Sequence, residues 1–380
     1  MTSSMRPLLV LALAACAGLA AEEAAAFKQA VGVRTFSFPG DHASHAGYQT
    51  EWWYVTGNAY DAAGRAFGWQ FTIFRRALAP QDAAARGRTS AWAANDFYLL
   101  HLAVSDIAGG HYLHEQSLER GVLGAAGATD AAAVKTKTDP VNVWMKNARF
   151  ERTAQGWTVH AGVEGCALDF VLRETVAPVL HGLKNEEGLS RKGPRPGQAS
   201  YYYSVPFLQT TGTLTLGGER FAIARGNAWM DHEFGSNQLS PEQAGWNWFA
   251  LQLDGGQALM LYVLRNKDGS IEPRSSGTWL DANGQATHLA LSDFTLTPGR
   301  TWHSAATGVD YALVWTIAIP ARQTTLTLQT ALDDQEFRSK ENGGFHYYEG
   351  AVRVKGTVGT QAATGDGYLE ITGGSLGGRL

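Results

Sequence analysis

The 380-residue sequence has little cysteine, little charge and, after its first 26 residues, no long apolar run. Its two cysteines are Cys16 and Cys166, and because Cys16 lies in a leader segment, we expect no internal disulfide in the mature chain. Charged residues make up only 17% of the chain, the net charge is −4 and no basic cluster occurs, which argues against nucleic-acid binding. The lack of a long apolar run argues against a transmembrane helix.

Residues 1–26 are expected to be an export signal. A short basic start precedes the apolar run Pro7–Ala15, and small residues follow. Leu13-Ala14-Ala15-Cys16 also fits the lipobox of bacterial lipoproteins, in which the cysteine becomes the lipidated first residue. Cleavage nearer Ala20 or Ala26 is the alternative. The sequence therefore predicts an exported protein, either periplasmic or lipid-anchored in the cell envelope, with membrane attachment only through Cys16.

Glycine and aromatic residues are abundant, and their placement predicts many short strands. The chain has 44 glycines and 12 tryptophans, and segments such as GRAFGWQFTIFRR alternate between apolar and polar residues, as half-buried strands do. We expect Val122–Thr138 to be a loop or one marginal helix, and Pro178–Ser200 to be a long loop of the kind that is often functional. Four pairs of turn residues predict β-hairpins: Gly109-Gly110, Gly217-Gly218, Gly255-Gly256 and Asn283-Gly284.

The sequence also contains an internal repeat, which predicts two copies of one antiparallel unit. We place the copies at residues 27–239 and 240–380. Each has about the number of strands of a lipocalin-like barrel or closed sandwich, so the expected fold class is all-β with two such domains in tandem. The matching segments are Trp52-Trp53 with Trp246–Trp248, HLAVSD at 101–106 with HLALSD at 288–293, Tyr202-Tyr203 with Tyr347-Tyr348, and Gly226–Asp231 with Gly365–Glu370.

Three ionisable residues stand in a row in the aromatic segment 225–236, RGNAWMDHEFGS. In a strand, Asp231 and Glu233 share one face and His232 points to the other. Since His232 aligns with Ile371 in the second copy, we expect His232 to face the core and the two carboxyl groups to face away from it. A carboxyl group held against aromatic surface has a raised pKa and can donate a proton. The alternative is a solvated strand face beside a core histidine.

The motifs resemble those of a known family, the acyclic-carotenoid hydratases (hydroxyneurosporene synthases) and their secreted AttH-like relatives, to which fungal Diels–Alderases are distantly similar. The resemblance covers roughly Phe36 to Gly373, and its most specific motifs are YQTEWWYVTGN and AWMDHEFGS. It implies two lipocalin-like domains with a ligand cavity, either inside a barrel or between the domains, and no cofactor.

The chemistry that the resemblance implies is acid-catalysed hydration of a C=C bond in an apolar isoprenoid-like or lipid-like small molecule. Asp231 would be the acid, Glu233 or Glu51 would hold its proton and position water, and His232 completes the candidate catalytic set. Aromatic faces would stabilise the cation by about 1–2 kcal/mol. The candidate substrate-contacting residues are Trp229, Tyr202, Tyr203, Trp53, Trp248 and His101. As an alternative, the tryptophans are core residues and Glu51 forms an ion pair with Arg75 or Arg76.

Two other functions stay open. An exported lipocalin-like protein could carry an apolar ligand without changing it, in partnership with an ABC transporter. A metal-dependent hydrolase would need His42, His45, Glu51, His101 and His232 to converge, but His42-x-x-His45 in a Pro/Gly-flanked loop is a weak metal-binding signal. A hydratase-type lyase without a metal or cofactor is therefore the favoured hypothesis.

Overall fold

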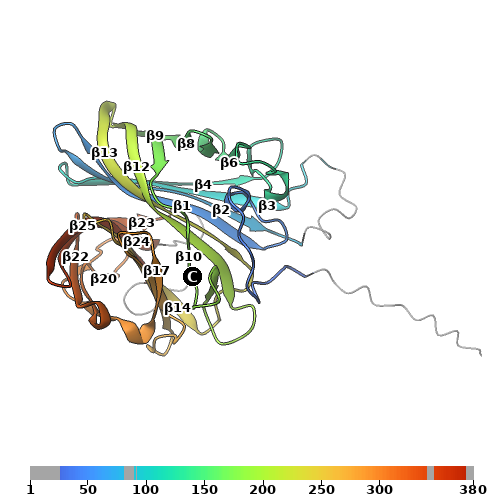
Figure 1. Cartoon of the computed structure of the whole chain (residues 1–380). Helices are drawn as coiled ribbons and strands as arrows, with labels where there is room; N and C mark the ends of the chain where they lie inside the picture. Colours follow the sequence, from blue (N-terminus) through green and yellow to red (C-terminus); the bar gives the residue numbers. More distant parts are fainter. Residues whose placement is uncertain (1–25, 81–89, 91, 340–345, 374–380) are drawn as a thin grey trace, which may run out of the picture.

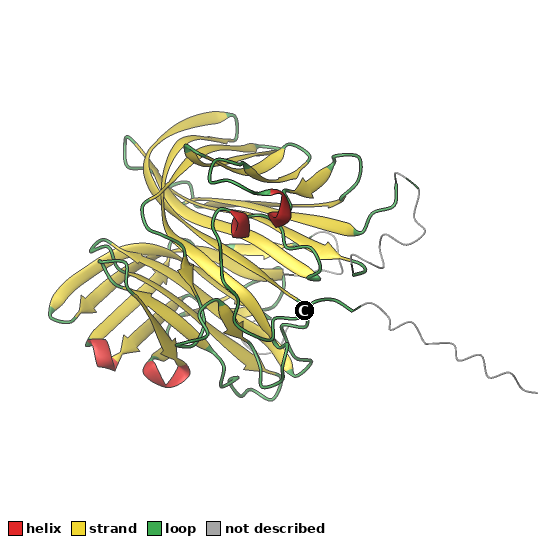
Figure 2. Cartoon of the chain, turned by 45° about the vertical axis from the view of Figure 1, so that its right-hand side comes forward, coloured by secondary structure: helices red, strands yellow, loops and turns green. Residues whose placement is uncertain are grey.

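The computed structural model describes residues 26–80, 90, 92–339 and 346–373. Cys16 and the lipobox lie outside the described residues. Two curled antiparallel sheets contain all but two strands of the described part of the chain, and they lie one above the other in Figure 1. No α-helix occurs among the described residues, and four short 3-10 helices are the helical segments in Figure 2. Accordingly, no described helix has the length and apolar character to cross a membrane.

The first sheet has 13 strands in the order β4-β3-β2-β1-β13-β12-β9-β8-β7-β6-β5, with β10 and β11 paired to β12. Its strands are β1 Thr50–Asp61, β2 Ala66–Ala77, β3 Asp96–Asp106, β4 His111–Arg120, β5 Ala126–Ala128, β6 Val141–Met145, β7 Ala148–Thr153, β8 Gly156–Val163, β9 Cys166–Glu174, β10 Val179–Leu180, β11 Leu189–Arg191, β12 Ala199–Leu216 and β13 Glu219–Gly235. The 3-10 helices η1 Gly40–His42 and η2 Ala131–Ala133 belong to this half.

The second sheet has 10 strands, of which nine follow the order β17-β16-β15-β14-β25-β24-β22-β21-β18, and β23 pairs with β24. Its strands are β14 Gln243–Leu253, β15 Ala258–Asn266, β16 Ser276–Leu280, β17 Ala286–Ala290, β18 Thr295–Pro298, β21 Val314–Ile319, β22 Thr324–Thr330, β23 Glu336–Arg338, β24 His346–Val358 and β25 Gln361–Thr372. A separate ribbon joins β19 Thr301–His303 to β20 Asp310–Ala312, and η3 Leu291–Asp293 and η4 Pro320–Arg322 complete this half.

The predicted all-β class and all four predicted hairpin turns are confirmed. Each turn pair falls between two neighbouring antiparallel strands, for example Gly217-Gly218 between β12 and β13. The segment Val122–Thr138, predicted to be a loop or one marginal helix, is mostly loop and holds the short strand β5 and the 3-10 helix η2. The segment Pro178–Ser200 holds β10 and β11, which add to the edge of β12 because their backbone groups find partners there.

The strand registers show how the two copies correspond. Ser204 is opposite Asp231 in the first sheet, and Glu349 is opposite Glu370 in the second. The strand order β2-β1-β13-β12 also recurs as β15-β14-β25-β24. The match between HLAVSD and HLALSD was wrong, because the first lies in β3 and the second spans the end of β17 and η3, whereas β3 corresponds to β16 by strand order.

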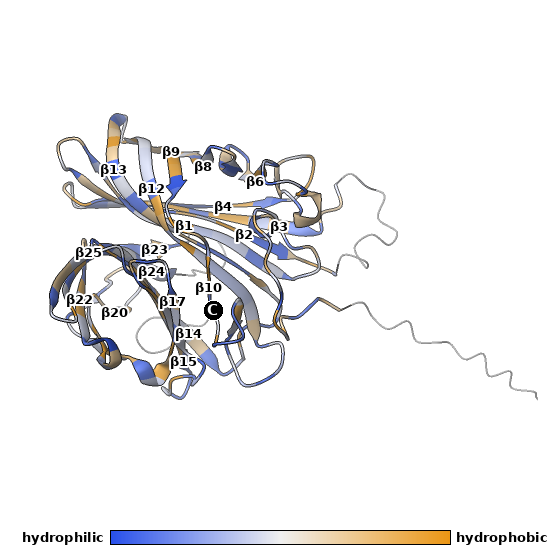
Figure 3. Ribbon diagram, viewed as in Figure 1, coloured by the Kyte–Doolittle hydropathy of each residue, from blue (hydrophilic) through white to orange (hydrophobic). Residues whose placement is uncertain are grey.

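Strand β1, the first half of β12 and the second half of β13 are buried on both faces, and this positions the site. On one face, residues such as Trp53 and Met230 pack into the core of the first sheet. On the other face, residues such as Tyr54 and Tyr202 pack against the second sheet around Trp248. Apolar and polar residues are accordingly intermingled along the strands in Figure 3. The alternation of a strand thus divides the ionisable residues of the first sheet into two separate groups.

Candidate active site

A cavity of about 440 Å³ lies between the two sheets, which is within the usual range for small-molecule sites. Strands from both sheets supply its walls, with aromatic residues that include Trp52, Tyr54, Tyr202, Trp246, Trp248 and Tyr347. A second hollow of about 600 Å³ is bordered by Arg195 and Glu242, whose side chains are mostly exposed, so it offers a ligand much less shelter from water. The first cavity is the candidate active site.

Asp231 faces this cavity from β13 and is 4% exposed. Three side chains donate hydrogen bonds to its carboxyl group. The Ser204 hydroxyl and the Trp229 indole N–H each lie 2.5 Å from Oδ1, and the Tyr202 hydroxyl lies 2.5 Å from Oδ2. Tyr202 in turn accepts a hydrogen bond from the Trp248 indole at 3.1 Å, so the second sheet helps to fix the acid.

The pKa of Asp231 is raised to about 7. Burial is the main cause, because it disfavours the charged form, and the nearby Glu233 carboxylate adds to it. The hydrogen bonds from Ser204, Tyr202 and Trp229 act in the opposite direction, because they stabilise the carboxylate. Asp231 is therefore able to lose and regain a proton near neutral pH, as general acid–base catalysis requires.

Glu233 lines the same cavity but has a different partner. Its carboxylate lies 3.4 Å from the ammonium group of Lys192, which is itself 7% exposed. Lys192 follows β11 and packs over the rings of Tyr202 and Tyr262, at 4.9 and 4.0 Å from their centroids. Glu233 therefore shares the cavity with Asp231 but is held by a buried cation, whereas Asp231 is held by three neutral donors.

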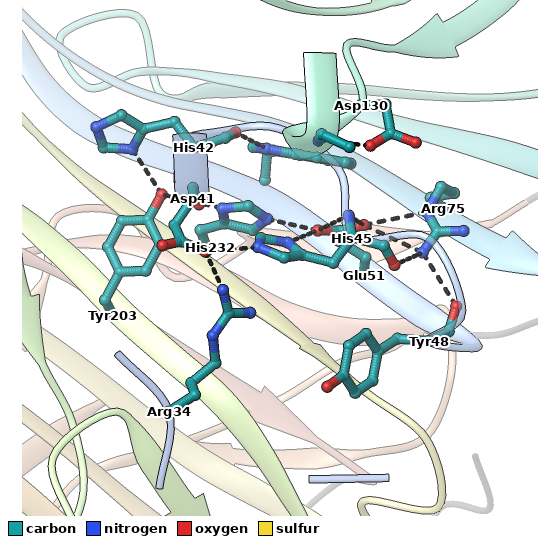
Figure 4. A network of polar contacts seen from close by, with 12 residues as sticks. Arg34, Asp41, His42, His45, Tyr48, Glu51, Arg75, Asp130, Tyr203 and His232 are labelled. Atoms are coloured by element: carbon teal, nitrogen blue, oxygen red, sulfur yellow. Dashed lines mark hydrogen bonds and ion pairs between the residues drawn. The ribbon is translucent and has the colours of Figure 1, made fainter. Parts of the chain in front are cut away.

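Glu51 and His232 do not reach the cavity. They lie on the opposite face of β1 and β13, inside the first sheet, and both are 0% exposed. Figure 4 shows them in a polar network with Asp41, His45 and Arg75. The His45 Nδ1 and His232 Nε2 atoms lie 2.8 and 2.9 Å from Glu51 Oε1, and the Arg75 guanidinium lies 3.1 Å from Oε2.

The charges of this network balance one another. Burial opposes ionisation of Glu51, but the Arg75 charge and the hydrogen bonds from His232 and His45 outweigh it and hold the pKa of Glu51 well below its usual range. Burial likewise disfavours the charged form of His45, yet its hydrogen bonds to Asp41 and Glu51 raise its pKa. Burial lowers the pKa of His232, whose ring bridges Glu51 and the Tyr203 hydroxyl.

The atoms His45 Nδ1, Glu51 O and His232 Nε2 lie within 4.8 Å of one another, so this cluster could hold a metal ion. In the network described here, however, each of these atoms already has a hydrogen-bond partner, and Arg75 supplies the positive charge that Glu51 requires. His42 joins the cluster through Tyr203, at 2.6 Å, whereas His101 lies in the cavity wall. The residues fit an ion-paired structural network better than an open metal site.

The six predicted substrate-contacting residues are divided between the cavity and the core of the first sheet. Tyr202, Trp248 and His101 line the cavity. Tyr203 and Trp53 lie in the first core, where Trp53 stacks on His232. Trp229 donates a hydrogen bond to Asp231 and packs edge-on against Trp248.

Four further residues line the cavity and were not predicted as site residues: Glu349, Glu370, Gln70 and Lys192. Glu370 could have been found, because the repeat aligns it with Asp231 and the register places Glu349 opposite it. Gln70 gives no sequence signal, and Lys192 falls in a segment that was predicted to be a loop.

A two-sheet, lipocalin-like fold with an acidic group at the sheet junction defines the class of this protein. The family model described as AttH-like matches residues 29–374, and the chain belongs to this family.

Solved structures and one curated protein resemble the chain. A protein from Nitrosomonas europaea described as an AttH is 33% identical, with a TM-score of 0.77 over 91% of this chain and 99% of that chain. Kievitone hydratase from Nectria haematococca shares the fold at 16% identity, with a TM-score of 0.67 over 92% of this chain and 98% of that chain. The dehydratase asqC of Emericella nidulans is 24% identical over 211 residues, which are 53% of this chain and 57% of that protein.

Proposed function

We propose that this protein adds water to, or removes water from, an apolar small molecule in the cavity between its sheets, with Asp231 as the general acid–base. The observation that carries the proposal is a buried carboxyl group with a pKa of about 7 that faces a cavity of about 440 Å³. Two relatives are named for this chemistry, a hydratase and a dehydratase. We also propose that the chain is exported, which rests on the sequence of residues 1–26.

In the direction of hydration, protonated Asp231 gives its proton to one carbon of the C=C bond. Water then bonds to the neighbouring carbon and releases a proton, so that the product is an alcohol and no net proton is consumed. Dehydration is the reverse. The three donors on Asp231 stabilise the carboxylate that remains, and the rings of Trp52, Tyr202 and Trp248 can stabilise a developing cation.

The test is native mass spectrometry and lipid extraction of the protein purified from its own cells, in wild-type and Asp231→Asn forms. The isosteric amide keeps the shape of the site but cannot carry the proton. We expect Asp231→Asn to retain an apolar molecule that the wild-type protein converts into a product differing by one water. Asp169→Asn, a change on the exposed outer face, is the matched control and should behave as wild type.

An unaltered molecule bound equally to wild type and Asp231→Asn would refute the proposal and would identify a carrier. The same conclusion would follow if the molecule isolated from Asp231→Asn were turned over at an equal rate by both proteins.

A further inference from the structure

The second sheet presents two carboxyl groups to the same cavity. Glu349 of β24 and Glu370 of β25 are direct cross-strand neighbours, and both line the cavity. The Tyr54 hydroxyl donates to Glu349 at 2.7 Å, and the Trp246 indole donates to Glu370 at 3.1 Å. Asp231 and this pair therefore face one cavity from different sheets.

The pair has no cationic partner. In the part of the chain that the structure describes, neither Glu349 nor Glu370 forms an ion pair with Lys, Arg or His, unlike Glu233 beside Lys192. Burial, followed by the neighbouring Glu370, raises the pKa of Glu349 well above its usual range. Burial raises the pKa of Glu370 to about 8. A neutral carboxyl group carries an O–H donor, so this wall offers donors to a ligand.

An acceptor without a partner lies beside these donors. Gln70 of β2 is 1% exposed and lines the cavity. Its amide nitrogen lies 3.0 Å from the Tyr347 hydroxyl and 3.3 Å from Glu349 Oε2, but its Oε1 atom is buried without a hydrogen-bond partner. A buried acceptor without a partner is costly, so a ligand that donates to Oε1 would relieve this cost.

We propose that Glu349, Glu370 and Gln70 form a hydroxyl-binding subsite, which holds the oxygen of the reacting water or of the alcohol that the reaction forms or consumes. A hydroxyl group accepts one hydrogen bond from a carboxyl O–H and donates its own proton to the Gln70 oxygen. A hydrocarbon can satisfy neither group. This inference rests on the proposed function, and it assigns to the substrate an alcohol oxygen at the wall formed by β24 and β25.

The subsite also completes the proton balance of the reaction. In hydration, Asp231 loses a proton to carbon while the water oxygen bonds to the neighbouring carbon. The proton that the water loses returns to the Asp231 carboxylate through the glutamate pair, in which a neutral carboxyl group accepts a proton on one oxygen and releases its own from the other. The Asp231 charge raises the pKa of both glutamates, so they stay neutral while Asp231 carries the single negative charge. The return of the proton leaves Asp231 protonated for the next turnover.

The test compares two probes, citronellol and the hydrocarbon in which hydrogen replaces its hydroxyl group. Binding is followed by quenching of tryptophan fluorescence, because Trp52, Trp246 and Trp248 line the cavity. We expect the alcohol to bind wild type roughly tenfold more tightly than the hydrocarbon. This preference should nearly disappear in Gln70→Leu and in Glu370→Leu, two independent changes that each remove one partner. Asp231→Asn should keep the preference.

Equal binding of the two probes to wild type, binding of neither probe, or an unchanged preference in both leucine variants would overturn the inference. These results are separable from failure of the proposed function. Loss of turnover in Asp231→Asn without an alcohol preference would leave the acid in place and remove the subsite. An alcohol preference with full turnover in Asp231→Asn would support the subsite and refute the role of Asp231 as the acid.

Discussion

Replacing Asp231 by asparagine should change how the stability of the protein depends on pH, and no substrate is needed to measure this. The pKa of Asp231 rises from 3.8 to about 7 on folding, because the buried site disfavours the carboxylate. The folded protein therefore holds a proton that the unfolded chain has already released. The bound proton stabilises the folded state. This stabilisation is complete below about pH 4 and is lost as the pH rises through about 7.

The magnitude follows from the shift. One pKa unit corresponds to about 1.4 kcal/mol, so a shift of about three units corresponds to about 4 kcal/mol over the whole window. Roughly 2–3 kcal/mol of this is lost between about pH 5 and about pH 8. Asparagine does not titrate, so the variant should lose less stability than wild type over this range, and the difference between the two should grow in favour of the variant as the pH rises.

The assay is urea unfolding of both proteins at several pH values, with thermal melting as a second measure. Glu349 and Glu370 also titrate with raised pKa values, but they are present in both proteins, so most of their contribution cancels in the difference. Parallel stability curves for wild type and Asp231→Asn would show that Asp231 ionises normally. A difference that shrinks with rising pH would show that the three donors stabilise the carboxylate more than burial destabilises it. Either result would refute the acid–base assignment.

Two further predictions concern the fold. Glu51→Gln should destabilise the protein by about 3–5 kcal/mol in thermal or urea unfolding, because it leaves Arg75 without its buried partner. Asp96→Asn, which removes the partly exposed partner of the same arginine, should cost about 1 kcal/mol or less, and equal losses in the two variants would contradict this reasoning. Gly57→Ala should cost about 1–3 kcal/mol, since its Cβ would lie 2.7 Å from the Trp69 indole nitrogen and 2.9 Å from a backbone oxygen. Gly40→Ala, where nothing lies within 4 Å, is the control, and an equal loss there would show that crowding is not the cause.

Most of the fold could be predicted because its signals are local. Alternating residues and paired turn residues fix strands and hairpins over a few positions, as at Gly217-Gly218. The direction of Asp231 and His232 followed from the alternation of β13 and from the apolar Ile371 in the second copy. The HLAVSD match failed because six similar residues carry no information about which strand of the sheet they form.

The cavity walls were harder to predict because they combine strands that are distant in sequence. Glu51 stands beside two tryptophans in the sequence, but alternation separates it from Trp52 and turns it into the first core, towards Arg75. Gln70 and Glu349 lie in different sheets, and only the packing of one sheet on the other brings them within 3.3 Å. The local sequence of neither strand predicts such a contact.

The repeat also explains why the polar network around Glu51 and His232 has no counterpart at the equivalent positions of the second sheet. In the second sheet, the positions equivalent to His232 and Glu51 are Ile371 and Gly245, as the registers of β1 with β13 and β14 with β25 show. In the first sheet, the segment before β1 folds back over the core, and its Asp41 and His45 enter the interior together with the backbone. Polar groups in such a place must find partners, and Glu51, Arg75 and His232 provide them. The central histidine of the aspartate–histidine–glutamate run therefore belongs to the polar network inside the first sheet, while the aspartate beside it faces the cavity between the sheets.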